Sequence, residues 1–152
     1  MMKIHVKLRR KFIFFEYITI EDNKGSKYSA EFSYDGDGCL VRDGRFVFEG
    51  SVHVHGKSFC NKNYVKCSQP YAPKDFIFHD GRVLKFSGYT ELGKLRHATL
   101  VLNDAECAKI TFKKTLMTED YFIEIDSNDE AVIDMVLYAF MHDFNWEHDV
   151  IF

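Results

Sequence analysis

Apolar and polar residues alternate along most of this chain with a period of two. In residues 3–9, the apolar side chains Ile4, Val6 and Leu8 alternate with basic and imidazole side chains. A strand with one buried and one solvated face has this pattern, because successive side chains point to opposite faces of a sheet. The pattern predicts further strands at 12–20, 27–34, 39–42, 45–49, 51–55, 59–67, 76–79, 82–89, 95–102, 105–114 and 120–126.

Turn-forming residues separate the predicted strands. Dipeptides of Asp, Asn and Gly at 43–44, 80–81 and 103–104 lie between two predicted strands, and such dipeptides favour the tight turns of β-hairpins. About twelve strands joined by short turns predict a mainly β protein, built either as a sandwich or as a closed antiparallel barrel.

The end of the chain has a different pattern, which predicts one α-helix at about 128–144. Ser127 and Glu130 have the spacing of a capping box, in which each side chain bonds a free backbone N–H at the helix start. Every residue of 131–141 is apolar except Asp134, so the helix has no polar face and must be surrounded. We expect it to lie along the axis of a closed barrel, because about twelve strands enclose more space than their own side chains fill.

Length and composition indicate one globular domain spanning 1–152. Of the 152 residues, 46% are apolar and 16% are aromatic, which excludes a disordered chain. The apolar run 131–141 is about half of what a bilayer crossing requires, so we expect no transmembrane segment. No signal peptide is recognisable and no Cys-x-x-Cys spacing occurs, so we expect a cytoplasmic protein with reduced thiols at Cys39, Cys60, Cys67 and Cys107.

Charge is unevenly distributed along the chain. Ten of the 23 acidic residues lie at 119–149, where no Lys or Arg occurs, whereas residues 1–114 carry all 20 Lys and Arg and a formal balance of +7. A basic region attracts phosphate-rich partners, unless the acidic tail neutralises it. We expect an anion-binding or lipid-binding face, with an ordinary solvated surface as the alternative, at Lys7, Arg9, Arg10, Lys11, Lys109, Lys113 and Lys114.

Three features follow one another in the segment 108–143. They are a basic strand, "AKITFKK", an alternating strand, "YFIEID", and an acidic turn that leads into an apolar helix ending in "HD". This order resembles the end of the LURP-one-related family, which belongs to the tubby-like superfamily alongside the phospholipid scramblases. The resemblance covers about the last quarter of the chain. The tail 145–152 extends beyond the family pattern, and we expect it to form a short strand or a plug over the barrel end.

The resemblance implies a closed barrel of about twelve strands around a central hydrophobic helix, with a non-enzymatic role at phosphoinositide or phospholipid membranes. Within such a barrel, Tyr121, Val136, Phe140 and Asp134 are expected core residues. A buried carboxylate requires a partner, so we expect Asp134 to face a polar group of the lumen, backbone N–H groups or the mouth of the barrel.

Other residues suggest chemistry more weakly. His53 and His55 share one face of a predicted strand and would chelate a metal only with a third ligand, which the nearby sequence lacks. The loop that begins at Asp35 has Phe46 where a calcium loop requires Glu, so it is not an EF-hand. Cys60 and Cys67 have no recognisable nucleophile context. An acid–base site near the helix end would use His142, Asp143, His148 and Asp149.

Three hypotheses follow for function. The first is a non-enzymatic tubby-like domain whose basic outer face binds anionic phospholipid or phosphoinositide, with no metal, no cofactor and no nucleic acid partner. The second is a cytoplasmic structural or protein-interaction domain without a ligand. The third is a small enzyme that uses the region of His142 and Asp143, where the simpler interpretation is that His142 offsets the negative end of the helix dipole.

Overall fold

Antiparallel strands make up most of the structure, and one helix follows them. The computed structural model describes residues 1–11, 15–32, 38–53, 56–60, 68–69, 75–77, 81–92 and 95–148, with side chains at 1–9, 18–29, 40–45, 81–87 and 97–140. The elements are β1 (Met2–Lys11), β2 (Phe15–Asp22), β3 (Tyr28–Phe32), β4 (Gly38–Arg42), β5 (Arg45–His53), β6 (Gly56–Cys60), β7 (Ser68–Gln69), β8 (Asp75–Ile77), β9 (Val83–Leu92), β10 (Leu95–Leu102), β11 (Ala105–Lys114), β12 (Thr118–Ile125) and α1 (Glu130–His148).

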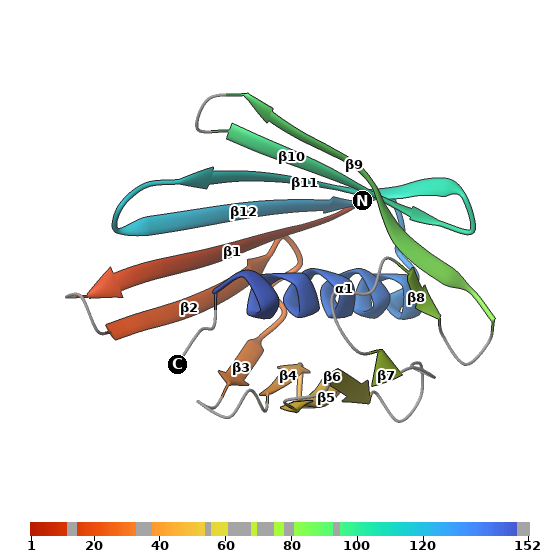
Figure 1. Cartoon of the computed structure of the whole chain (residues 1–152), viewed down its shortest axis with the longest axis horizontal. Coiled ribbons are helices and arrows are strands. Elements are labelled where there is room, and N and C mark those ends of the chain that lie inside the picture. Colours follow the sequence, from red (N-terminus) through yellow and green to blue (C-terminus); the bar gives the residue numbers. More distant parts are fainter. Residues whose placement is uncertain are drawn as a thin grey trace.

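The described strands form two antiparallel sheets. One has seven strands in the order β2-β1-β12-β11-β10-β9-β8, and the other has five in the order β3-β4-β5-β6-β7 (Figure 1). An isolated bridge between Glu21 and Lys27 links the β2 edge of the first sheet to the start of β3. The mainly β class with a C-terminal helix is therefore correct. In the described part of the chain the ladders do not close into one barrel, so that closure stays a prediction.

The period of two in β1 arises because this strand has one buried and one outward face. Met2, Ile4, Val6 and Leu8 are each 2% exposed or less, and the residues between them are more exposed. β1 pairs with β2 on one side and with β12 on the other, so it is a central strand of its sheet. The alternation in the sequence thus predicted both the strand and its inward face.

The predicted hairpin turns between β4 and β5 and between β10 and β11 are present. Asp43 and Gly44 have φ of 52° and 78°, and Asn103 and Asp104 have φ of 49° and 67°. These residue types adopt positive φ at little cost, which is what a two-residue hairpin turn requires. The Asn103 side chain also accepts a 2.9 Å hydrogen bond from the Val83 backbone N–H, which braces the turn against β9.

The strands at 45–60 differ from the prediction. Segments 45–49 and 51–55 were predicted as two strands, but residues Arg45–His53 form the single strand β5. Gly50 lies inside β5, paired with Gly38 and with Phe59, so ladder pairing on both sides overrides the tendency of glycine to end a strand.

The loop predicted after residue 67 also contains structure. Ser68–Gln69 form the short strand β7, because their backbone pairs with Lys57 and Ser58 of β6. Pairing with a neighbouring strand can order a segment whose own sequence favours a loop. The rest of the predicted strand 59–67 lies outside the described residues beyond Cys60.

The helix α1 begins at a different cap from the one predicted. The Ile133 N–H bonds the Asp129 carbonyl, and the Asp129 carboxylate accepts a 3.0 Å hydrogen bond from the Ala131 N–H. Asp129 is therefore the N-cap, and the capping box of Ser127 and Glu130 is wrong. The Ser127 hydroxyl instead accepts a bond from the Asp129 N–H.

The helix also ends later than expected. It continues to His148 rather than 144, so the first half of the tail that we expected to form a strand or a plug, 145–148, is helical, and 149–152 lie outside the described residues. The sequence signal at this end was weak, because no glycine or proline follows Phe144 to stop a helix.

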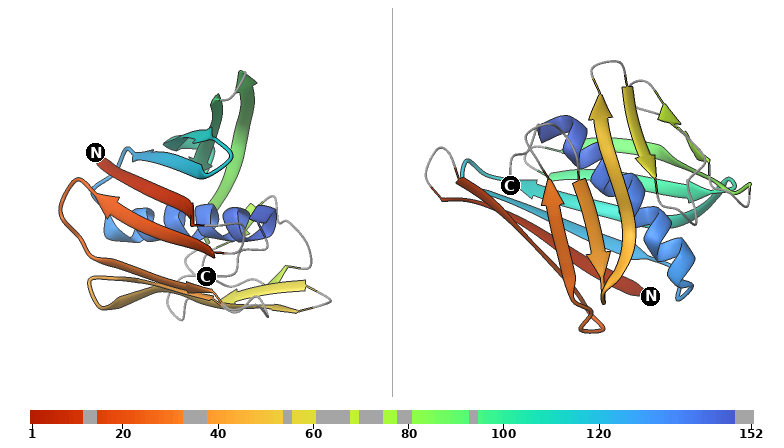
Figure 2. Two further views of the ribbon diagram at one scale, coloured as in Figure 1. Left: turned by 90° about the vertical axis from the view of Figure 1, so that its left-hand side faces the viewer. Right: turned by 90° about the horizontal axis from the view of Figure 1, so that it is seen from below.

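Every helix residue from Val132 to Phe140 is buried, with 8% exposure or less. Because nine successive residues point in all directions around a helix, this part of α1 has no exposed face. The helix runs between the two sheets and contacts β5 of one sheet and β9 of the other (Figures 1 and 2). A helix without a polar stripe is thus explained by sheets on both sides of it.

Candidate functional site

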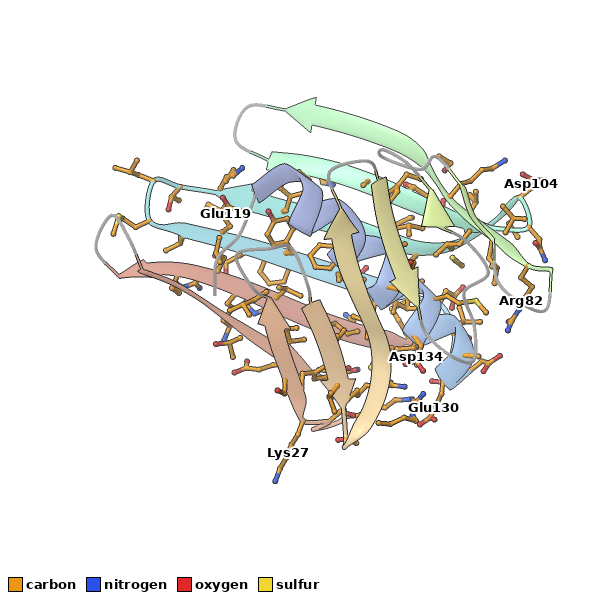
Figure 3. All side chains as sticks on the ribbon, turned by 60° about the horizontal axis from the view of Figure 1, so that its bottom comes forward. Lys27, Arg82, Asp104, Glu119, Glu130 and Asp134 are labelled. Carbon is orange, nitrogen blue, oxygen red and sulfur yellow. The ribbon has the colours of Figure 1, made fainter. Side chains whose placement is uncertain are left out.

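A buried ion cluster joins α1 to the hairpin of β4 and β5. The Asp134 carboxylate is 1% exposed and accepts a 2.9 Å hydrogen bond from the Arg42 guanidinium, whose side chain is 4% exposed. Arg45, across the turn, donates to both oxygens of that carboxylate and lies 3.4 Å from Glu130. Figure 3 labels Asp134 and Glu130 on α1. The expected partner of Asp134 was a lumen polar group, a backbone N–H or the barrel mouth, and the structure places two arginines there.

The charge state of Asp134 follows from these contacts. Burial, together with the charge of Glu130, raises the pKa of Asp134 overall, although the hydrogen bond from Arg45 and the charges of Arg42 and Arg45 act in the opposite direction. A guanidinium group only donates hydrogen bonds and stays protonated, so the two arginines favour the carboxylate form of Asp134. The chemical result is an anchor that fixes the helix against the hairpin.

The cluster continues through Tyr28 to the edge of the β3 strand. The Tyr28 hydroxyl donates a 2.8 Å hydrogen bond to Asp22, whose other oxygen accepts bonds from the Lys24 and Ser26 N–H groups. Burial and the bond to Asp22 raise the pKa of Tyr28, and the charge of Arg42 acts against this rise. Burial also acts to raise the pKa of Asp22, but its hydrogen bonds from Ser26, Tyr28 and Lys24 lower it overall.

Most of the described basic residues singled out in the sequence lie on the solvent side of the seven-stranded sheet. We define this outer face as the side chains of β1, β12 and β11 that alternate with buried ones. β12 lies between β1 and β11, so the register places its acids between the basic residues. The resulting rows across the three strands are Lys3–Glu124–Lys109, His5–Phe122–Thr111 and Lys7–Asp120–Lys113.

The predicted basic set is only partly brought together. Lys7, Arg9, Lys109 and Lys113 share the outer face, and the side chains of Arg10 and Lys11 lie outside the described part of the chain. Lys114 follows Lys113 and alternates to the other side of β11, where its Nζ lies 3.4 Å from the buried Glu119. Glu119 also accepts a 2.7 Å hydrogen bond from the Tyr121 hydroxyl.

Acidic partners offset several cations of the outer face. Lys7 lies 3.0 Å from Glu21, and Lys109 lies 3.2 Å from Glu106. Asp120 accepts a 2.9 Å bond from Arg9, whose guanidinium also bonds the Leu8 and Glu119 carbonyls.

These acids were missed at the sequence level, although a signal was present. In "DYFIEID" the acids alternate with buried residues, which places them on the outer side of the strand. Strand order was the missing information, because only the pairing of β12 with both β1 and β11 sets those acids between the lysines.

A histidine and an aromatic ring occupy the middle row. His5 stacks on Phe122 with ring centroids 4.3 Å apart, and its Nε2 lies 2.8 Å from Asp120 Oδ1. Burial acts to raise the pKa of Asp120, but the hydrogen bonds and charges of Arg9 and His5 lower it overall. Phe122 is still 46% exposed, which is unusual for a large aromatic ring in mid-strand.

A second apolar feature lies at the turn between β11 and β12. Leu116 is 85% exposed and Met117 is 45% exposed. We call these two residues the β11–β12 tip. The sequence predicted the neighbouring lysines as candidate anion-binding residues, but it did not predict the tip. The segment "TLM" between two strands has no turn signature of Gly, Asn or Asp.

Comparison of the chain with models of protein families, with curated proteins and with solved structures found no match.

Other candidate sites are not assembled in the described residues. No group of three or more His, Cys, Asp or Glu side chains is placed there to hold a metal ion. Nor does a described helix have the length and apolarity that a membrane span requires. Cys107 is buried and free. The following lie wholly, or through their side chains, outside the described part of the chain: His53, His55, Cys39, Cys60, Cys67, His142, Asp143, His148 and Asp149.

Proposed function

We propose that this chain is a non-catalytic binding domain that attaches to anionic phospholipid surfaces through the outer face. The observation that carries the proposal is the register of β1, β12 and β11. The row of Lys7, Asp120 and Lys113 carries two cations and one acid, and the row through Lys3 and Lys109 does the same. Basic side chains thus outnumber acids on this face.

The ion pairs weaken this electrostatic attraction without abolishing it. An exposed pair such as Lys109 with Glu106, whose side chains are 64% and 55% exposed, contributes about 0–1 kcal/mol. A lysine near an anionic leaflet gains about 1 kcal/mol. Lipid phosphate can therefore compete for these lysines at little cost, and the attraction of the whole face is modest and sensitive to salt.

We also propose that the two sheets complete a tubby-like barrel around α1. Two observations support this: the burial of residues Val132 to Phe140 of α1 on all sides, and the bridge between Glu21 and Lys27 that connects the sheets at one edge. In this proposal the domain works in the cytoplasm, where the free Cys107 stays reduced and the facing leaflet carries the anionic lipid.

Vesicle sedimentation tests the lipid proposal. Phosphatidylcholine vesicles with and without phosphatidylserine or phosphoinositide are compared at low and high salt. We expect binding only when anionic lipid is present, with a loss at high salt. The double variant Lys109→Glu/Lys113→Glu should weaken binding by about tenfold or more, because two attractive charges become repulsive.

The matched control carries the same change of charge away from the outer face. Lys24 and Lys27 are exposed beside the β2–β3 turn, and Lys27 points away from the seven-stranded sheet (Figure 3). Lys24→Glu/Lys27→Glu should bind anionic vesicles like the wild type. Equal losses in both double variants would show a non-specific effect of net charge, and no binding of the wild type to any anionic vesicle would refute the proposal.

The exposed Phe122 favours a second candidate, a protein-interaction domain. Aromatic residues are enriched in protein interfaces, and this ring lies in the centre of the outer face, stacked on His5. In that case Phe122→Ala would abolish association with a protein partner, and the wild type would show no affinity for anionic vesicles.

A further inference from the structure

The β11–β12 tip exposes two large apolar side chains at a place where turns are usually polar. Leu116 is 85% exposed and Met117 is 45% exposed, and neither has a positive φ that would make it a conformational requirement of the turn. Turn positions usually carry Gly, Asn, Asp or Ser, which suit the backbone and water. Two adjacent apolar residues at a turn therefore require another explanation.

The turn holds the tip in a fixed position. The Thr115 N–H donates a 2.8 Å hydrogen bond to the Thr118 carbonyl, and the Thr118 N–H donates a 3.1 Å bond to the Thr115 hydroxyl. The two threonine hydroxyls lie 2.6 Å apart. A turn ordered in this way loses little conformational freedom when its apolar side chains enter another phase, so their transfer is more favourable.

Three cations lie at the base of the tip, and two of them, Lys114 and Arg9, pair with Glu119 and Asp120. Lys113 is exposed on the outer face, and Lys114 is on the other side of the same strand. Arg9 of β1 pairs in register with Thr118, so its guanidinium also lies at this end of the sheet. Apolar side chains with basic residues behind them are complementary to an anionic bilayer, whose phosphates lie above its acyl chains.

We propose that the β11–β12 tip inserts Leu116 and Met117 into the interface of an anionic bilayer, while the cations behind them contact lipid phosphates. This inference rests on the proposed function and adds the orientation: the outer face is tilted toward the membrane so that the end of the sheet that carries the tip lies nearest the lipid. The tip lies at the opposite end of the molecule from the start of α1 (Figures 1 and 3), so the buried Asp134 cluster stays away from the lipid.

Paired serine variants test the orientation. Leu116→Ser/Met117→Ser should lower partition onto vesicles that contain phosphatidylserine by at least about tenfold, because burial of a large apolar side chain is worth about that factor or more. The matched control is Lys24→Ser/Lys27→Ser, which exchanges two exposed side chains for serine beside the β2–β3 turn, away from the tip and the outer face. Insertion of the tip predicts that this control binds like the wild type.

The position of the tip can also be read directly. Leu116→Trp should show a blue-shifted emission and quenching by brominated lipid, beyond the signal of the native Trp146 in the wild type. Thr19→Trp, on an exposed position of β2, should show neither.

The results of these experiments separate failure of the proposed lipid binding from failure of tip insertion. Failure of the wild type to bind any anionic vesicle overturns the proposed function and this inference together. Binding of the wild type with no loss in the tip variant, or with quenching at position 19 and none at 116, overturns the inference alone. Equal binding to neutral and anionic vesicles also overturns it, because the cations would then contribute nothing.

Discussion

Removal of Asp134 tests whether the buried ion cluster anchors the helix. In Asp134→Asn, Arg42 keeps a guanidinium that is 4% exposed but loses the carboxylate that accepts its 2.9 Å hydrogen bond. An uncompensated charge at such a site typically costs about 3–5 kcal/mol. A domain of this size is stable by about 5–15 kcal/mol, so the variant should lose a large fraction of its free energy of unfolding.

Arg42 and Arg45 should contribute different amounts to the free energy of unfolding. The side chain of Arg45 is 39% exposed, so water can solvate its guanidinium when Asp134 is substituted, and Arg42 still pairs with Asp134 when Arg45 is substituted. We expect Arg45→Met to cost about 1 kcal/mol or less, near the range of exposed ion pairs. Arg42→Met should cost about as much as Asp134→Asn, because it leaves a carboxylate that is 1% exposed without its buried partner.

Urea denaturation followed by far-ultraviolet circular dichroism measures these free energies. A double-mutant cycle with Asp134→Leu and Arg42→Met isolates the coupling, and we expect the pair of changes together to cost less than their sum by at least about 1 kcal/mol. Additive losses would refute the direct interaction. A loss below about 1 kcal/mol in Asp134→Asn, or a larger loss in Arg45→Met than in Arg42→Met, would refute the anchoring role.

The remaining predictions concern the helix and the outer face. Leu137→Lys should lower the free energy of unfolding by several kcal/mol, and an unchanged melting temperature would mean that α1 has an exposed face. Asp129→Ala should cost about 1 kcal/mol because it removes the N-cap side chain, and a larger loss in Glu130→Ala would restore the capping-box interpretation. The pKa of Asp120 is lowered in the folded state. The ionised side chain therefore contributes to the free energy of unfolding at pH values above the ordinary pKa of aspartate, and this contribution is lost as pH falls below about 4. Urea titrations should therefore show a smaller acid loss of stability in Asp120→Asn, and an unchanged pH profile would contradict this linkage.

The strands and turns whose conformation depends on residues close in sequence could be predicted from residue types and their spacing. The alternation in β1 identified its buried residues, and the Asp43-Gly44 turn adopts the positive φ that its residue types favour. The all-apolar helix correctly indicated burial on every side. Gly50 misled the strand prediction, because pairing partners on both sides of β5 determined its conformation.

The candidate sites were harder to predict because they depend on pairing across the chain. Arg42 and Arg45 come from a hairpin about ninety residues before Asp134, and nothing local to either segment connects them. The same holds for the outer face, where the sequence shows the lysines but only the strand order places Asp120 and Glu124 between them.

The central claim is that an anionic membrane surface binds the outer face and the β11–β12 tip. Its most direct test is the partition of the wild-type chain onto phosphatidylcholine vesicles in which the fraction of phosphatidylserine rises from zero. We expect no binding to the neutral vesicles and a steep increase with the anionic fraction, which is reversed by salt. Binding that is absent at every composition, or that does not depend on the anionic fraction, would contradict it.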